Sequence, residues 1–172
     1  SLIKDDKPGD VPALFRQMYI MGTGPNSLSY ILLYRAFAAS GNTKSVGRLY
    51  ISQTLQNVTF DKDLIYTILF SAAYCHDIPL IEDILKDMRT QYNIPVDSVA
   101  IQGIIDGYYA RCDPLVSNDI LSIGTYACET GLILSSATVN IILDSIKNTE
   151  NSKKVLDKFS IFNRFQNNIY GC

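Results

Sequence analysis

The chain has 172 residues, of which 47% are apolar and 19% are charged, and its formal net charge is −2. This composition excludes an intrinsically disordered polymer, which has fewer apolar and more charged residues. It also indicates no membrane span, because no apolar stretch approaches the roughly 20 residues that a bilayer requires.

The first residues predict a linker. Residues 1–10 are polar and contain Pro8 and Gly9, and they lack the apolar segment of a signal peptide. Because the chain begins with Ser1 rather than Met, we expect it to be a fragment of a longer protein. The apolar pattern of residues 11–21 then predicts the second helix of a truncated repeat.

A short joint that opens with Asn or Gly recurs along the chain. These two residues tolerate the left-handed conformation that follows many helix ends. Two helical stretches separated by a break lie between consecutive joints, so the period predicts paired helices. The joints begin at Gly22, Asn57, Asn93, Gly131 and Asn168, which are 35, 36, 38 and 37 residues apart.

The first helix of each pair carries one apolar stripe with the spacing i, i+3, i+7, followed by a small residue. In the first pair, Leu28 and Leu32 are expected on the buried side with the stripe. The predicted first helices are 28–40, 64–75, 99–111 and 137–148. The predicted stripes are Tyr30/Leu33/Phe37, Tyr66/Leu69/Ala73, Ile101/Ile104/Tyr108 and Val139/Ile142/Ile146, and the small residues are Ala36, Ala72, Gly107 and Ser145.

These hairpins are too small to fold alone, so neighbours must stack. We therefore predict an all-α fold: an α-solenoid of stacked antiparallel helix-hairpin repeats, with about four repeats. The predicted segments are a polar linker (1–10), the second helix of a truncated repeat (11–26), and repeats at 27–61, 62–97, 98–135 and 136–172.

Several helices resemble those of pentatricopeptide repeat (PPR) proteins. The segments IQGIIDGY (101–108) and TVNIILDS (138–145) resemble the first-helix motif of that family, and LFRQM (14–18) and ILKDM (84–88) resemble its second-helix motif. The resemblance covers nearly the whole chain from Val11. A tetratricopeptide repeat fits less well, because its period is about 34 and it carries a Trp, which this chain lacks.

The resemblance implies binding of single-stranded RNA, one base per repeat, in mitochondria or plastids. In PPR proteins, a residue on the first helix and the last residue of the repeat together select the base. Thr67 with Asp97 resembles a guanine-preferring pair, and Asn140 resembles a pyrimidine reader. Ile31 departs from the pattern because it has no hydrogen-bonding atom. The implied RNA-binding residues are Ile31 with Asp61, Thr67 with Asp97, Gln102 with Ser135, and Asn140, whose partner would fall at or beyond Cys172.

Each candidate also has a purely structural interpretation. Asp61 and Asp97 directly precede a helix and can be N-caps. Thr67 and Asn140 can be ordinary residues of an exposed helix face. The apolar residues that a PPR protein would place beside a base can instead belong to the core; these are Leu28, Leu64, Val99 and Ala137.

Charge is distributed unevenly along the chain. Residues 1–60 contain six basic and three acidic residues, residues 61–129 contain four and eleven, and residues 130–172 contain five and three. The acidic middle would oppose a phosphate chain wherever its carboxylates face it. Several of these acids fall on second helices, which we expect to face outward: Glu82, Asp83, Asp87 and Asp119.

Catalysis and metal binding have little support, and we predict that the chain is not an enzyme and uses no cofactor. His76 is the one histidine and falls in a break between helices, and no Gly-rich phosphate loop is present. The cysteines form no CxxC pair, so we expect no metal site. We expect them to be reduced, buried small hydrophobes: Cys75, Cys112, Cys128 and Cys172.

The sequence thus predicts an RNA-binding protein of the mitochondrial matrix, with a composition that resembles fungal PPR proteins. Its partner would be a mitochondrial mRNA or rRNA, and the mitochondrial ribosome or other gene-expression proteins are further expected partners. The function would be transcript stabilisation, translation activation or a role in the ribosome. A helical-repeat scaffold that binds another protein is the alternative. The tyrosines suit base stacking or a protein interface equally; they include Tyr34, Tyr50, Tyr74, Tyr108, Tyr109 and Tyr126.

Overall fold

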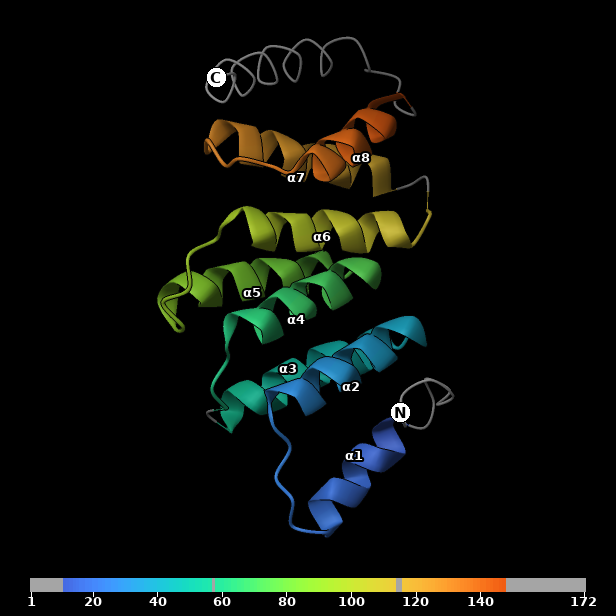
Figure 1. Cartoon of the computed structure of the whole chain (residues 1–172), viewed down its shortest axis with the longest axis vertical. Coiled ribbons are helices and arrows are strands. Elements are labelled where there is room, and N and C mark those ends of the chain that lie inside the picture. Colours follow the sequence, from blue (N-terminus) through green and yellow to red (C-terminus); the bar gives the residue numbers. More distant parts are fainter. Residues whose placement is uncertain (1–10, 57, 114–115, 148–172) are drawn as a thin grey trace. The chain divides into compact units, whose positions relative to one another are not determined.

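The structure, a computed structural model, describes residues 11–56, 58–113 and 116–147. The regular elements of these residues are all α-helices, as predicted (Figure 1). They are α1 (Val11–Ile20), α2 (Ser27–Ala39), α3 (Thr43–Leu55), α4 (Lys62–Tyr74), α5 (Ile78–Thr90), α6 (Ser98–Ala110), α7 (Ser117–Glu129) and α8 (Ser136–Lys147). The expected linker at 1–10, the joints at Asn57 and Asn168, and the second helix of the fourth repeat lie outside the described residues.

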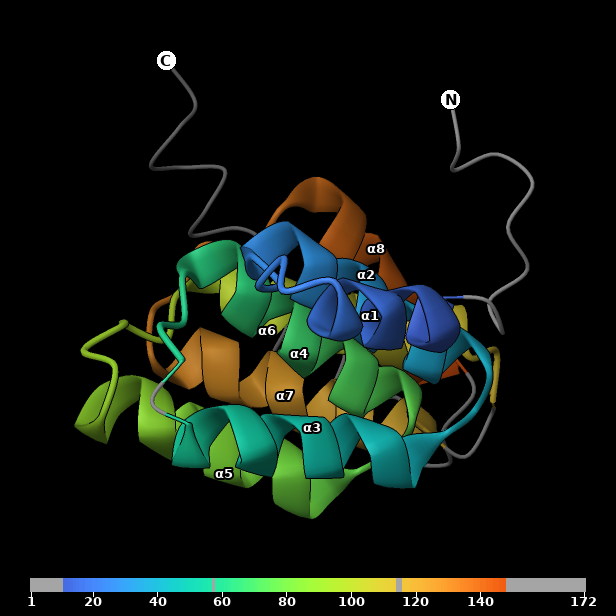
Figure 2. The same ribbon diagram turned by 90° about the horizontal axis from the view of Figure 1, so that it is seen from below.

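The chain divides into two compact units, one ending at Pro95 and the other beginning at Val96. In the first unit α2 packs against α1, α3 and α4, and α4 also packs against α3 and α5. Here α2 and α4 form one layer and α3 and α5 a second, which Figure 2 shows from the end. In the second unit α6, α7 and α8 pack against one another.

The helices repeat in length as well as in order. Each of the helices α2 to α7 has 13 residues. A residue with positive φ follows six of the helices: α1, α2, α4, α5, α6 and α7. These residues are Gly41 (φ 68°), His76 (58°) and Cys112 (54°) after first helices, and Gly22 (71°), Asn93 (51°) and Gly131 (71°) after second helices. The left-handed conformation ends the helix and turns the chain back, which confirms the joints predicted at Gly22, Asn93 and Gly131.

A side-chain N-cap begins every first helix. In each, an oxygen of the cap accepts a hydrogen bond from the backbone N–H of the third helical residue, which is otherwise unpaired. The interpretation of Asp61 and Asp97 as N-caps is therefore confirmed. The four bonds join Ser29 to Asn26 (2.9 Å), Leu64 to Asp61 (2.8 Å), Ala100 to Asp97 (3.0 Å) and Thr138 to Ser135 (3.2 Å).

These caps set a common numbering, in which N1 is the first residue after the cap. Positions N4, N7 and N10 are buried in all four first helices, and N10 is always small, which allows neighbouring helices to pack closely. Burying one Leu or Ile contributes about 1.5–3 kcal/mol. The buried triplets are Tyr30/Leu33/Ala36, Ile65/Ile68/Ser71, Ile101/Ile104/Gly107 and Val139/Ile142/Ser145.

The cap numbering differs from the alignment predicted for the second repeat. The sequence aligned Tyr66 with Tyr30, but both Tyr30 and Ile65 stand at N4, so the predicted alignment is wrong by one residue. The reason is that the hydrogen bond from Leu64 N–H to Asp61, rather than the repeated tyrosine, sets where α4 begins.

Three apolar side chains expected to be buried are exposed. Leu28 at N2 is 62% exposed and Leu32 at N6 is 37% exposed, because both positions turn away from the stripe. The apolar pattern of the second helix in the first pair also predicts that Leu55 is buried, but this side chain, at the end of α3, is 78% exposed. Cys112 also differs from the prediction: it is exposed, because it lies at the positive-φ turn after α6.

Candidate nucleic-acid interface

Positions N2, N5 and N9 form an exposed stripe on each first helix. None of these side chains is buried; five of the twelve are half-buried (Ile31, Tyr66, Phe70, Gln102 and Asp106), and the other seven are exposed. The spacing i, i+3, i+7 places the three on one side of the helix. The stripes are Leu28/Ile31/Arg35 on α2, Asp63/Tyr66/Phe70 on α4, Val99/Gln102/Asp106 on α6 and Ala137/Asn140/Asp144 on α8.

The predicted RNA-binding residue Thr67 lies at N6, outside the stripe. Its side chain is 8% exposed, and its hydroxyl donates a hydrogen bond to the backbone carbonyl of Asp63 at 2.8 Å. Tyr66 occupies N5, the position equivalent to Ile31, and is half-buried. The cap numbering therefore makes Tyr66, rather than Thr67, the candidate RNA-binding residue of this repeat.

Helix α4 carries a row of aromatic residues that the sequence analysis missed. Tyr66, Phe70 and Tyr74 follow one another at i, i+4, i+8, and each is half-buried. The rings of Phe70 and Tyr74 are stacked, with centroids 6.2 Å apart and an interplanar angle of 24°. The four-residue spacing of these aromatic residues in the sequence could have indicated the row. Such a row offers flat ring surfaces of the kind on which bases stack.

The caps at the start of α2 and α4 are linked to each other. The hydroxyl of Ser27 donates a hydrogen bond to Oδ2 of Asp61, while Oδ1 of Asp61 caps α4. Asp61 is exposed, and Ile31 lies one turn along α2 in the adjoining helix of the same layer. The structure thus places Ile31 and Asp61 near the same end of this layer.

The second unit presents amides in place of aromatic rings. Gln102 on α6 is half-buried and hydrogen-bonded to Asp106. Burial raises the pKa of Asp106, and the hydrogen bond from Gln102 partly offsets this by lowering that pKa. Asn140 on α8 is exposed. Ser135 caps α8, and its hydroxyl also lies 2.8 Å from the hydroxyl of Thr138. The stripe here mixes amide groups, which can pair with base edges, with carboxylates, which repel phosphate.

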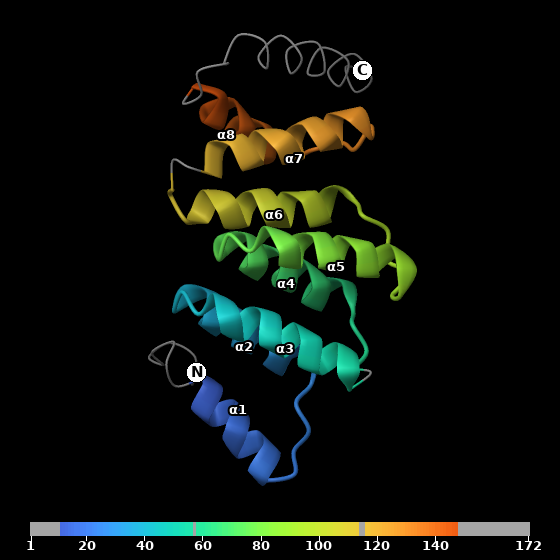
Figure 3. The same cartoon turned by 180° about the vertical axis from the view of Figure 1, so that it is seen from behind.

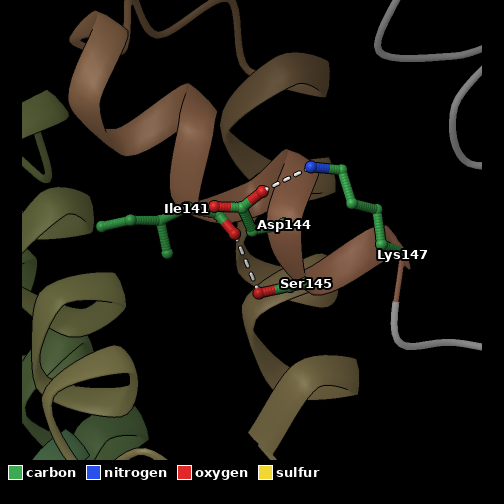
Figure 4. A network of polar contacts seen from close by, with 4 residues as sticks. All are labelled: Ile141, Asp144, Ser145 and Lys147. Atoms are coloured by element: carbon green, nitrogen blue, oxygen red, sulfur yellow. Dashed lines mark hydrogen bonds and ion pairs between the residues drawn. The ribbon is translucent and has the colours of Figure 1, made fainter.

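One carboxylate of this stripe is paired with a cation. Nζ of Lys147 lies 2.7 Å from Oδ1 of Asp144, on the outer side of α8 (Figure 4). One position along the chain, the hydroxyl of Ser145 donates to the carbonyl of Ile141 at 2.9 Å. That bond satisfies the hydroxyl of Ser145 within its own helix, whereas the buried hydroxyl of Ser71, at N10 of α4, has no hydrogen-bond partner among the described residues.

Helices α1 to α3 carry positive charge without any acid. Residues 11–60 contain four cations and no Asp or Glu. All four side chains are exposed, and none pairs with a carboxylate of the described residues. Arg35 is the one in the stripe, at N9 of α2. The cations are Arg16, Arg35, Lys44 and Arg48.

Three of the tyrosines proposed as an interaction surface belong to the core instead. Tyr34, Tyr50 and Tyr108 are at most 4% exposed. Burial raises the pKa of Tyr108 to about 12. The hydroxyl of Tyr34 donates to Gln53 on α3, so this tyrosine ties the two layers of the first unit together. Tyr109 is 51% exposed.

Replacing the cap residue Asp61 by Ala is expected to lower the free energy of unfolding by about 0.5–2 kcal/mol, since the N–H of Leu64 loses its acceptor. Urea unfolding measures this change. Asp61→Asn is the matched control and should keep most of the stability, because Asn already caps α2 in the same way. Equal losses of stability for Asp61→Ala and Asp61→Asn would show that the charge of Asp61, rather than its capping hydrogen bond, stabilises the fold.

Metal-ligand clusters and membrane-spanning helices are both absent from the described residues. Within them, no three His, Cys, Asp or Glu side chains come together as potential metal ligands. No helix of the described ranges is both long and apolar enough to cross a membrane. No protein-family model matches the chain, and no curated protein matches it.

Proposed function

We propose that this chain binds single-stranded RNA along the exposed stripes of its first helices, as a PPR-like protein with an α-solenoid architecture. One observation carries the proposal: the same cap numbering gives α2, α4, α6 and α8 a triplet of exposed or half-buried side chains at N2, N5 and N9 beside a buried triplet at N4, N7 and N10. A surface that recurs once per repeat suits a polymer with one base per repeat.

The first unit supplies most of the affinity in this proposal. Bases stack on the aromatic row of α4, and each stacked base contributes about 1–3 kcal/mol. Arg35 contacts a phosphate from the neighbouring helix α2. Because helices α1 to α3 hold no carboxylate, nothing on them opposes the RNA backbone.

The second unit supplies selectivity rather than affinity. Asn140 offers both a donor and an acceptor to a base edge. Gln102 offers the same groups but shares them with Asp106. The carboxylates at N9 of α6 and α8 keep phosphates away from this unit, so binding here depends on base contacts.

The proposed partner is a mitochondrial mRNA or rRNA, and the proposed setting is the mitochondrial matrix. The function would be transcript stabilisation, translation activation or a role at the mitochondrial ribosome. This part rests on the resemblance of the helices to PPR motifs. With few repeats, binding by this chain alone should be weak.

A salt titration with labelled single-stranded homopolymers of uridine, adenosine or cytidine tests the proposal. The logarithm of the affinity should fall linearly with the logarithm of salt concentration. Arg35→Gln should lower the magnitude of this slope by about 0.7, because each phosphate contact on a single strand contributes that amount. Anisotropy of the labelled RNA measures both quantities.

Arg48→Gln is the matched control, since it removes the same charge from α3 in the other layer. Its slope should equal that of the unaltered chain. Equal slopes for Arg35→Gln and the unaltered chain would remove Arg35 from the interface. Absence of binding to all three homopolymers at low salt would reject the proposed function.

A further inference from the structure

A groove of about 400 Å³ lies on the second layer of the first unit, between α3 and α5. Figure 3 shows these two helices side by side in front of α2 and α4. The groove is therefore on the layer opposite the stripes of α2 and α4. The argument below uses three residues of its α3 wall, Gly47, Ile51 and Leu55, and three of its α5 wall, Asp77, Asp83 and Asp87.

The α3 wall of the groove is an exposed apolar row. Ile51 is 58% exposed and Leu55 is 78% exposed, and their i, i+4 spacing places both on one side of the helix. Val46 and Tyr50 already supply the buried contacts of α3. Since Ile51 and Leu55 add little to that core, their apolar surface is available to a partner.

Gly47 lies in line with this row, one turn before Ile51. Glycine inside a helix costs about 0.5–1 kcal/mol relative to Ala. A Cβ at this position would meet only Cδ2 of Leu80, at 4.0 Å, which is ordinary van der Waals contact. The fold therefore does not require Gly here. A bare backbone in the wall of a groove does, however, allow a second backbone to approach closely.

The α5 wall of the groove is acidic. Three carboxylates and the single cation Lys86 line it, a net charge of −2. Two of the carboxylates are held in place: Asp77 accepts from the N–H of Leu80 (3.2 Å), and Asp87 accepts from the hydroxyl of Tyr50 (2.7 Å) and from Gln91 (3.0 Å). Asp83 is exposed. The cations of α3, Lys44 and Arg48, do not line the groove.

We propose that the α3–α5 groove binds an amphipathic helix of a partner protein, with an apolar row that packs on Ile51 and Leu55 and flanking Lys or Arg side chains that face Asp83 and Asp87. A helix laid into a groove uses this combination of an apolar row and complementary charge. RNA fits the groove poorly, because the carboxylates repel phosphate. This site is independent of the stripes, so the chain joins two partners.

A synthetic amphipathic helical peptide of Leu and Lys tests the groove against the full chain, with anisotropy as the measurement. Asp83→Lys should weaken binding by about tenfold, which corresponds to 1.4 kcal/mol. Glu82→Lys is the matched control: it makes the same charge change at the next residue of α5, which is exposed and does not line the groove. Equal affinities for the two variants would overturn the proposal.

Gly47→Met provides a second test, because its side chain would fill the groove while the substitution favours the helix. Circular dichroism should confirm that the variant is folded, and peptide binding should fall by about tenfold or more. Unchanged peptide binding would overturn the proposal. A matching loss of single-stranded RNA binding in Gly47→Met would also overturn it, since the groove would then belong to the RNA site.

Discussion

Ile68→Ala should lower the free energy of unfolding by about 2–5 kcal/mol, the range observed when a buried Leu or Ile is truncated. Ile68 stands at N7 of α4 and is fully buried, at 0% exposure. Its removal leaves a cavity in the middle of the first unit, where α4 packs against α2, α3 and α5. Urea unfolding followed by circular dichroism measures the loss.

Leu28→Ala is the control for Ile68→Ala. Leu28 has a similar volume but stands at N2 in the exposed stripe, so the change in stability should stay within about 0.5 kcal/mol. Its RNA affinity should fall instead, if the stripe binds RNA. A loss of several kcal/mol for Leu28→Ala would show that the cap numbering does not separate the buried from the exposed positions.

Tyr66→Ala should weaken RNA binding by about 5- to 150-fold, because it removes one stacking surface worth about 1–3 kcal/mol. Thr67→Ala should leave the affinity unchanged, since the hydroxyl of Thr67 is occupied by the carbonyl of Asp63. Anisotropy with the homopolymer that binds best measures both variants.

Tyr66→Phe keeps the ring and should keep most of the affinity, which separates stacking from hydrogen bonding by the hydroxyl. The opposite result would be a loss of RNA affinity for Thr67→Ala and none for Tyr66→Ala. It would favour Thr67, the base-selecting residue predicted from the sequence, over Tyr66, which the cap numbering favours.

The all-α fold was predictable because its signals are local. The apolar spacing of Leu33, Ile104 and Ile142 predicted which side of each helix is buried, and the joints at Gly22, Asn93 and Gly131 predicted where the chain turns. Both follow from properties of a few adjacent residues. The positive φ of Cys112 had no such signal, because cysteine does not favour that conformation.

The candidate site was predicted less well, because it depends on single-residue differences in numbering. Asp61 and Asp63 both stand near the start of α4, and only the hydrogen bond to Leu64 shows which of them is the cap. Because Asp61 is the cap, N5 is Tyr66 and not Thr67. The groove beside Gly47 was not predictable, since its two walls come from helices in different repeats.

The common cap numbering separates two kinds of change in this protein. A substitution at N2, N5 or N9 alters only what the surface presents, so ligand preference can drift without loss of the fold. A single inserted residue between the cap and N5 has the opposite effect: it rotates everything downstream by about 100°, which turns the buried positions N7 and N10 away from their contacts in the core. We therefore expect homologous chains to vary freely at N2, N5 and N9 but to gain or lose length in whole hairpins.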